Sequence, residues 1–150
     1  MSESNDRKVS KETKNKIFWE TTVESEDKTG SPRLVNFRLY IHKWRVPEPV
    51  PQTIYVGIKA AKLQKKPKFL SVDDVLEDPE LRVKPIIAII HGFKQYTETL
   101  RYHPIEDQSE WEIGEPYIPY SLTFNQAEYL KITVKWEKPA DRGYLELTNS

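Results

Sequence analysis

The sequence predicts an all-β fold, either a β-sandwich or a partly open barrel of about seven or eight short strands, with one or two short helices. In three stretches, which begin at Val35, Thr53 and Leu130, apolar and polar residues alternate one by one, as on a strand with one buried face. Val, Ile and Thr, which favour strands, number 32, against 16 for Ala and Leu. No long apolar stripe at helical spacing occurs. The alternative is an α+β fold in which the helices cover a mixed sheet.

The first part of the chain is expected to contain three strands, at residues 17–24, 35–42 and 53–59. Gly30 and Pro32 place a loop between the first two. Three prolines precede the third strand, and because proline cannot donate to a ladder they predict an extended connection. The residues expected to face the core are Val35, Phe37, Leu39, Ile41, Ile54, Val56 and Ile58.

A short helix and a long apolar strand are expected in the middle of the chain. Ser71 can cap a helix that Pro79 limits to two turns. Residues 83–93 include four isoleucines and one alanine at 86–90, a run that is apolar on both faces. We therefore expect this strand to be the most buried in the molecule.

The last third is expected to consist of short elements. Pro119 predicts that the strand containing it lies at an edge or is bulged. A turn at 141–143 predicts that the last two strands form a C-terminal hairpin. The expected elements are helical turns at 95–102 and 125–129 and strands at 111–113, 117–124, 130–137 and 144–148.

Residues 1–15 are expected to form a flexible polar tail and residues 16–150 a single β-rich domain. The tail contains only Met1 and Val9 as large apolar residues, so it cannot bury enough surface to offset its ordering entropy. The chain has no apolar signal-peptide segment, no apolar run near the ~20 residues of a transmembrane helix, and no cysteine. We therefore expect an intracellular, cytoplasmic protein with no membrane partner.

Motifs for catalysis, metals and cofactors are weak in this sequence. The apolar strand that ends in His91-Gly92 resembles the segment before the oxyanion loop of α/β-hydrolases, but no serine with flanking glycines follows it. The other two histidines, His42 and His103, are far from His91 in sequence. The five glycines form neither a P-loop nor a dinucleotide-binding fingerprint. We therefore expect no metal and no cofactor, and an enzyme ranks below a binding protein.

The charged residues sum to zero but are segregated along the chain. Lys and Arg together number 23, as do Asp and Glu, so no net field draws the chain to nucleic acid. Residues 59–68 contain lysines and no acid, whereas residues 73–80 and 106–115 are acidic. The lysine block is either a solvated loop or a contact for anions.

One strand has the character of a binding surface. Arg38, Tyr40 and His42 share the face opposite the apolar face, and Trp44 joins them if the strand continues to Val46. In solvent this row, with a spacing of about 7 Å, would stack bases or contact a partner protein. In the alternative, a second layer covers this face and Arg38 is paired with a carboxylate. The lysines that would add phosphate contacts are Lys59, Lys62, Lys65, Lys66, Lys68, Lys131 and Lys135.

We therefore predict a non-catalytic interaction or assembly module, which docks into a larger intracellular complex or associates with itself. Its four Trp and eight Tyr residues favour this function, because such residues anchor interfaces. The alternative is a single-stranded nucleic-acid-binding domain that uses the row from Arg38 to Trp44. The net charge of zero counts against it, because counterion release usually supplies most of such affinity.

Overall fold

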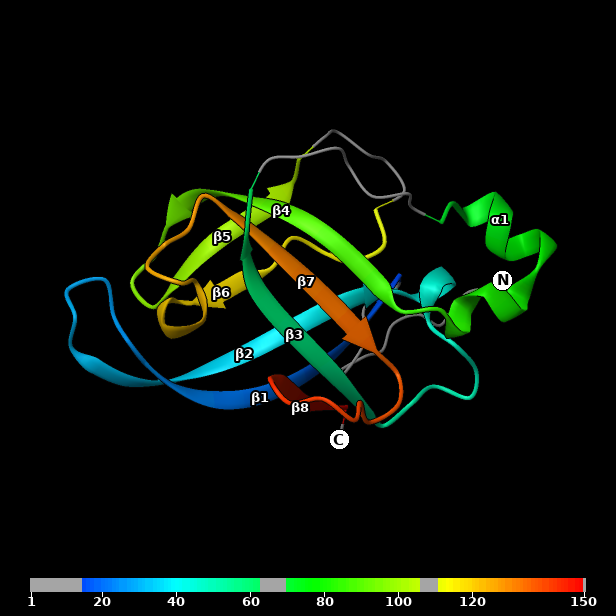
Figure 1. Cartoon of the computed structure of the whole chain (residues 1–150), viewed down its shortest axis with the longest axis horizontal. Helices are drawn as coiled ribbons and strands as arrows, with labels where there is room; N and C mark the ends of the chain where they lie inside the picture. The colour runs from blue at the N-terminus through cyan, green and yellow to red at the C-terminus, as the bar shows by residue number, and fades with distance from the viewer. Residues whose placement is uncertain (1–14, 63–69, 106–110, 150) are drawn as a thin grey trace.

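The computed structural model describes residues 15–62, 70–105 and 111–149 (Figure 1). Its eight strands form one antiparallel sheet in the order β2-β1-β8-β3-β7-β4-β5-β6. The strands are β1 (Lys16–Glu26), β2 (Pro32–His42), β3 (Thr53–Ala61), β4 (Ile86–Gln95), β5 (Thr99–Pro104), β6 (Tyr117–Pro119), β7 (Tyr129–Lys135) and β8 (Tyr144–Thr148). The helical elements of the described residues are α1 (Val72–Glu77) and the 3-10 turns η2 (Lys43–Arg45), η3 (Pro79–Val83) and η4 (Tyr120–Leu122). The fold is therefore all-β, as predicted, and not α+β.

The two edges of the sheet meet through the segment that leads into β6. The backbone N–H of His42 donates to the carbonyl of Glu112 at 3.0 Å, and that of Gly114 donates to the carbonyl of Tyr40 at 2.9 Å. An isolated bridge lies between these two bonds. The sheet therefore curls into a nearly closed barrel rather than forming a two-layer sandwich (Figure 1).

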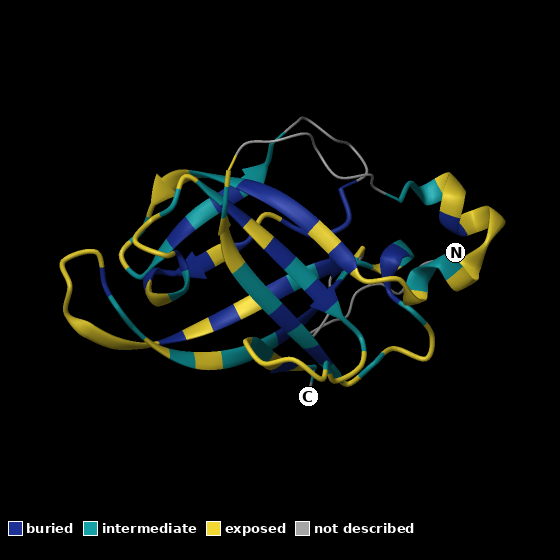
Figure 2. Cartoon of the chain, in the orientation of Figure 1, coloured by how far each residue is buried: buried dark blue, intermediate teal, exposed yellow. Residues whose placement is uncertain are grey.

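The inner face of the barrel is the hydrophobic core. Phe37, Leu39 and Ile41 of β2 are fully buried, as are alternate apolar residues of β3 and β7. Figure 2 shows this alternation as bands of buried and more exposed residues along the strands. Burial of one such side chain is worth about 1.5–3 kcal/mol, so the alternating pattern fixes which face turns inward. The predicted core faces are confirmed, although Ile58 is only partly buried.

The apolar strand β4 differs from its prediction in two ways. It runs to Gln95, so His91-Gly92 lies inside the strand and not at its end. Alternate residues of Ile86–Ile90 face the core, but Ile87 is 44% exposed. On the outer face of this strand Ile89 is buried, whereas Ile87 meets solvent. The expectation that both faces of this strand are buried is therefore wrong at Ile87.

Neither predicted helical turn in the last third is present. Residues 95–102 form the end of β4, a turn and the start of β5. At the site of the second expected turn, Phe124, Asn125 and Gln126 have φ angles of 54°, 63° and 59°. This is left-handed backbone, a conformation that residues other than glycine rarely adopt.

Strand pairing in the last third also differs from the prediction. β8 does not form a hairpin with β7, because β3 lies between them and pairs with both. The expected strand at 111–113 is reduced to the bridge at Ile113, and the expected strand at 117–124 is shortened to β6. β6 is an edge strand, as Pro119 predicted.

Helix α1 begins as predicted. The backbone N–H of Asp74 donates to Ser71 Oγ at 3.1 Å, and the backbone N–H of Ser71 donates to Asp74 Oδ2 at 3.1 Å. This reciprocal capping box satisfies two backbone donors at the start of the helix. Residues 1–14, which cover most of the expected tail, lie outside the described residues.

A buried ion pair ties η2 to two other segments. Arg45 is 1% exposed, and its Nε donates to the carboxylate of Glu112, which is also buried. Its Nη1 donates to the carbonyl of Arg82 at 2.8 Å, and its Nη2 donates to the carbonyl of Lys84 at 2.7 Å. Burial raises the pKa of the Glu112 carboxyl, and its bond with Arg45 opposes that rise.

Candidate functional site

The predicted row on β2 lies on the outer face of the barrel. Arg38 is exposed, whereas Tyr40 and His42 are half-buried. The Nε of Arg38 donates to Glu20 Oε1 at 3.0 Å, and its guanidinium carbon lies 4.5 Å from the ring centroid of Phe18. The ring centroids of Phe18 and Tyr40 are 5.1 Å apart. Arg38 is therefore paired with a carboxylate, on a face that is partly open to solvent.

The row ends at His42. β2 stops there, and Trp44 lies in η2, so it does not continue the alternation of the strand. Burial, helped by the charge of Lys16, lowers the pKa of His42 below its usual value. A neutral imidazole offers no positive charge to a phosphate, so the charged group that the row presents is Arg38.

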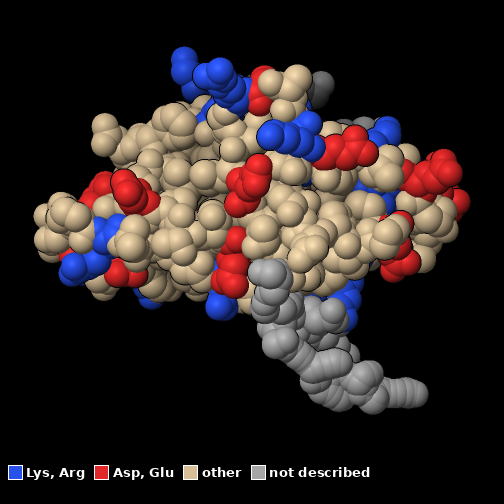
Figure 3. Space-filling model, turned by 90° about the horizontal axis from the view of Figure 1, so that it is seen from below, with Lys and Arg blue, Asp and Glu red and all other residues tan. Residues whose placement is uncertain are grey.

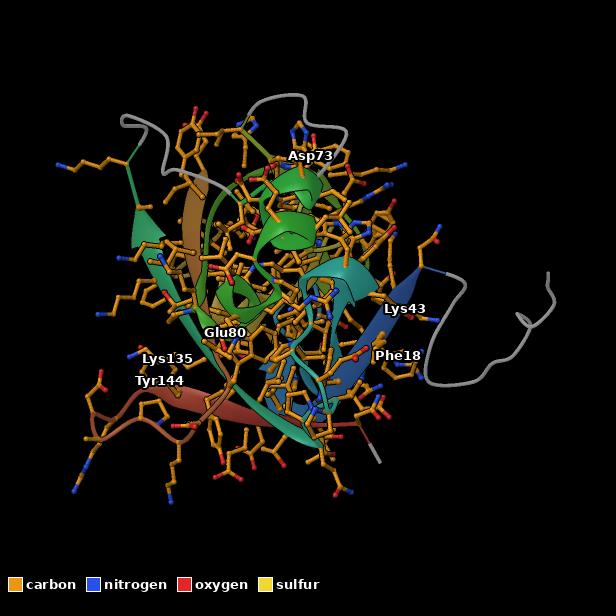
Figure 4. The ribbon with its side chains drawn as sticks, turned by 90° about the vertical axis from the view of Figure 1, so that its right-hand side faces the viewer. Phe18, Lys43, Asp73, Glu80, Lys135 and Tyr144 are labelled. Carbon is orange, nitrogen blue, oxygen red and sulfur yellow. The ribbon has the colours of Figure 1, made fainter. Side chains whose placement is uncertain are left out.

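The lysines of the predicted site do not lie beside this row. β1, β8 and β3 separate β2 from β7 in the sheet, so Lys131 and Lys135 face another side of the barrel. The Nζ of Lys135 lies 5.0 Å from the ring centroid of Tyr144, and Figure 4 shows this pair on the opposite side of the view from Phe18. Lys65, Lys66 and Lys68 lie outside the described residues.

Two of the predicted lysines are brought together. Lys59 of β3 and Lys131 of β7 are direct cross-strand partners, and both are exposed on the outer face. Lys62 is exposed just beyond the end of β3. The fold therefore places positive charge on the outer face of β3 and β7.

A larger set of aromatic side chains covers the outer face of β4, β5 and β6 and the start of β7. The ring centroid of His91 lies 5.0 Å from that of Tyr129 and 5.5 Å from that of His103. The ring of His103 in turn lies 4.5 Å from that of Phe93, in an edge-on arrangement. We call this surface the aromatic face; its members are His91, Phe93, Tyr96, Arg101, His103, Tyr117 and Tyr129.

Arg101 connects the two halves of the aromatic face. Its guanidinium carbon lies 5.1 Å from the ring centroid of Phe93 and 5.4 Å from that of Tyr117. The rings of Tyr117 and Tyr96 meet edge to face at 5.3 Å. The Nε of Arg101 donates to Glu115 Oε1 at 3.1 Å, and this bond raises the pKa of Arg101. Arg101 in turn lowers the pKa of the Tyr96 phenol by hydrogen bonding.

A β-bulge in β4 places Phe93 on this face. The register with β5 shifts between Gly92, which is opposite Tyr102, and Lys94, which is opposite Arg101. Consecutive strand residues normally point to opposite sides, but the bulge leaves both Phe93 and Lys94 outside, near Arg101. The bulge thus adds one aromatic and one basic side chain to the same surface.

A left-handed turn that carries another exposed ring lies beside the end of β4. Phe93 is 46% exposed, Tyr117 is 42% exposed, and Phe124 in the turn is 54% exposed. The side chain of Gln126 in this turn hydrogen-bonds to that of Gln95. Residues with sparsely populated backbone conformations are often found at functional sites. The turn is therefore a further candidate next to the aromatic face.

The aromatic face was not predicted from the sequence, because its members come from four strands and one turn. The sequence predicts a helical turn at 95–102, where β4 in fact ends and β5 begins. The strand that carries Arg101 and His103 was therefore not predicted. The signal that could have found it is short: Leu100 and Tyr102 face inward and alternate with the two outward residues. Four residues of alternation do not distinguish a strand from a turn.

Other parts of the surface offer weaker candidates. The described residues contain no group of three or more His, Cys, Asp or Glu side chains that could hold a metal ion. Viewed from below, acidic and basic side chains are scattered among uncharged ones, with acids at the end where α1 lies (Figure 3). A wide, open depression on the β1–β2 hairpin is lined by Glu24, Ser25, Glu26, Pro32, Arg33 and Leu34.

None of the helices in ranges 15–62, 70–105 and 111–149 has the length and apolar character needed to cross a membrane. Comparisons of the chain with models of protein families, with curated proteins and with solved structures give no match in any of the three. The fold and the site define a nearly closed antiparallel barrel with an aromatic outer face.

Proposed function

We propose that this protein is a non-catalytic binding module whose contact surface is the aromatic face. One observation carries the proposal: seven side chains outside the barrel form a continuous chain of ring and cation–π contacts. Single exposed apolar residues are normal on protein surfaces, but contiguous exposed patches mark sites of interaction. Tyr and Arg, which are both present, are among the residues that most often dominate binding energy.

The contacts within the aromatic face also prepare it for binding. Arg101 is held by Glu115 on one side and by the rings of Phe93 and Tyr117 on the other. Ordering a free side chain at an interface costs about 0.5–1.5 kcal/mol, and side chains that are already ordered avoid part of that cost. The arrangement therefore favours tight binding from a small area.

We infer that such a module serves as a subunit of a larger cytoplasmic assembly. The row of Arg38 and Tyr40 on β2 remains a second predicted contact surface, on another side of the barrel. It is the weaker of the two, because its chain of ring and cation–π contacts contains only Arg38, Phe18 and Tyr40.

The test is the size of the complex that the tagged full chain enters in its source cells. We expect Phe93→Ala and Tyr117→Ala to release the chain from that complex, because each removes a nearly half-exposed ring from the contact surface. The matched control is Leu76→Ala, which removes an exposed apolar side chain from α1 at the other end of the barrel (Figure 1). Unfolding midpoints of all variants show whether each chain is folded.

Native-size chromatography should place the wild-type chain and Leu76→Ala in one large complex and the two aromatic-face variants in the fraction of free chain. A wild-type chain that elutes alone, or folded variants that all remain in the complex, would refute the proposed function.

A further inference from the structure

The outer face of β3 and β7 contains an unfavourable pair of charges. Lys59 and Lys131 lie directly opposite each other, and among the described residues neither forms an ion pair. Like charges directly opposite each other destabilise a sheet. An anion bound between them would remove this repulsion, so the pair is suited to contact a phosphate.

The lysine pair is continuous with the aromatic face. On β4, Ile89 is the partner of Lys131 and His91 is the partner of Tyr129. Residues two positions apart on a strand lie on the same face at a distance of about 7 Å. The lysine pair therefore forms the next outer row beside Tyr129 and His91.

Positive charge also lies at the far end of the aromatic face. Lys94 is exposed, and its Nζ lies 5.3 Å from the ring centroid of Tyr96. From Lys131 to Tyr117 the surface crosses three strand spacings and two rows, about 20 Å in all. This length, with cations at both ends and rings between them, is on the scale of a site for about four nucleotides.

We propose, on the basis of the function proposed above, that the aromatic face and the Lys59–Lys131 pair bind a single strand of nucleic acid. Bases stack on the rings, a contact that tolerates any sequence because every base has a π-face. Phosphates contact Lys59, Lys131 and Lys94 and release counterions. A single strand fits this surface because it supplies phosphates for the lysines at both ends and bases for the rings between them.

The net charge of zero is compatible with this ligand because the charges are separated in space. Acidic side chains gather on α1 and η3, where Figure 4 labels Asp73 and Glu80, at the other end of the molecule from β6 (Figure 1). On the aromatic face itself, Glu115 and Glu128 lie against Arg101 and His91. The lysines are thus left to face a polyanion.

The test is fluorescence anisotropy of labelled oligothymidylate and oligouridylate of about 12 nucleotides with the full chain, at about 50 and 200 mM salt. We expect binding that weakens with salt, a loss of about tenfold in affinity for Phe93→Ala and for Tyr117→Ala, and a similar loss for Lys131→Glu with a shallower salt dependence. Lys138→Glu, which changes an exposed lysine beyond the end of β7, is the matched control and should bind as wild type.

Lys131→Glu separates binding from folding. It replaces a like-charge pair with an attractive pair opposite Lys59, so its urea midpoint should be at or above that of wild type. A more stable variant that binds less tightly supports the site.

The inference is overturned if neither oligonucleotide binds, or if the three site variants bind as well as Lys138→Glu. If the oligonucleotides do not bind but Phe93→Ala still releases the chain from its cellular complex, the partner is a protein. In that case the proposed function stands and this inference fails.

Discussion

Arg45 holds together three segments that are distant in the sequence. Its guanidinium contacts the carboxylate of Glu112 and the backbone carbonyls of Arg82 and Lys84. One side chain thus fixes η2, the segment before β6 and the segment that leads from η3 into β4. Residues 45 and 112 are 67 positions apart, so no local pattern of residues could have indicated their pairing.

Replacement of Arg45 by Met should be strongly destabilising. It leaves the Glu112 carboxylate buried without a counter-charge and removes the donors to three backbone carbonyls, at a cost of about 3–5 kcal/mol. The measurement is the free energy of unfolding in urea. The control is Arg38→Met, which breaks the exposed pair with Glu20 and should cost about 1 kcal/mol or less.

The defect of Arg45→Met should depend on pH in one direction. Glu112 has an ordinary pKa of 4.5, and burial raises it in the folded chain. Above that pH the unfolded chain releases the proton while the folded variant retains it, so stability falls as pH rises. Equal losses for the Arg45 and Arg38 variants, or a deficit that shrinks with rising pH, would contradict this account.

The bulge in β4 is the element that shapes the aromatic face, and Gly92 makes it compatible with the core. A Cβ at this position would lie 3.1 Å from the ring of Tyr102 and 3.3 Å from the side chain of Leu100. Tyr102 is fully buried, and its hydroxyl donates to the carbonyl of Ala127 at 2.8 Å. The ring therefore has little room to move away.

Gly92→Ala should destabilise the protein by about 1–3 kcal/mol through overpacking. Gly57→Ala is a matched comparison, because a Cβ there meets the ring of Tyr144, which is partly exposed and can turn away. That variant should be close to wild type, since alanine also lowers the entropy of the unfolded chain. Thermal unfolding of both variants decides the point, and a Gly92→Ala protein as stable as Gly57→Ala would show that the bulge is not tightly packed.

Elements were predictable where one face of a strand is buried over six or more residues. β2, β3 and β7 meet this condition, and their inward residues were identified from alternation alone. β5 contains only four residues that alternate between the inner and outer face. The turn at Phe124–Gln126 has left-handed backbone, which its residue composition does not indicate. Local patterns thus predicted the regular strands and failed at the irregular joins between them.

At the scale of the whole molecule, the decisive contacts are non-local. The closure of the barrel depends on hydrogen bonds between β2 and the segment before β6, and β3 separates β7 from β8. The aromatic face follows from that order, because it combines rings from four strands. The proximity of these rings depends on the strand order. The alternation of apolar and polar residues along each strand does not indicate that order.

The same strand order places the two candidate contact surfaces on different strands of the barrel. The aromatic face and the Lys59–Lys131 pair share the side made by β3, β7, β4, β5 and β6, whereas the row of Arg38 and Tyr40 lies on β2. The central claim is that the first of these sides, and not the second, contacts the partner.

Hydroxyl-radical footprinting, read by mass spectrometry on the free chain and on the chain in its isolated complex, tests this claim most directly. We predict that Phe93, Tyr96 and Tyr117 become protected in the complex while Tyr40, the half-buried ring of the β2 row, is oxidised at the same rate in both forms. Protection of Tyr40 with no change at Phe93 and Tyr117 would contradict the account.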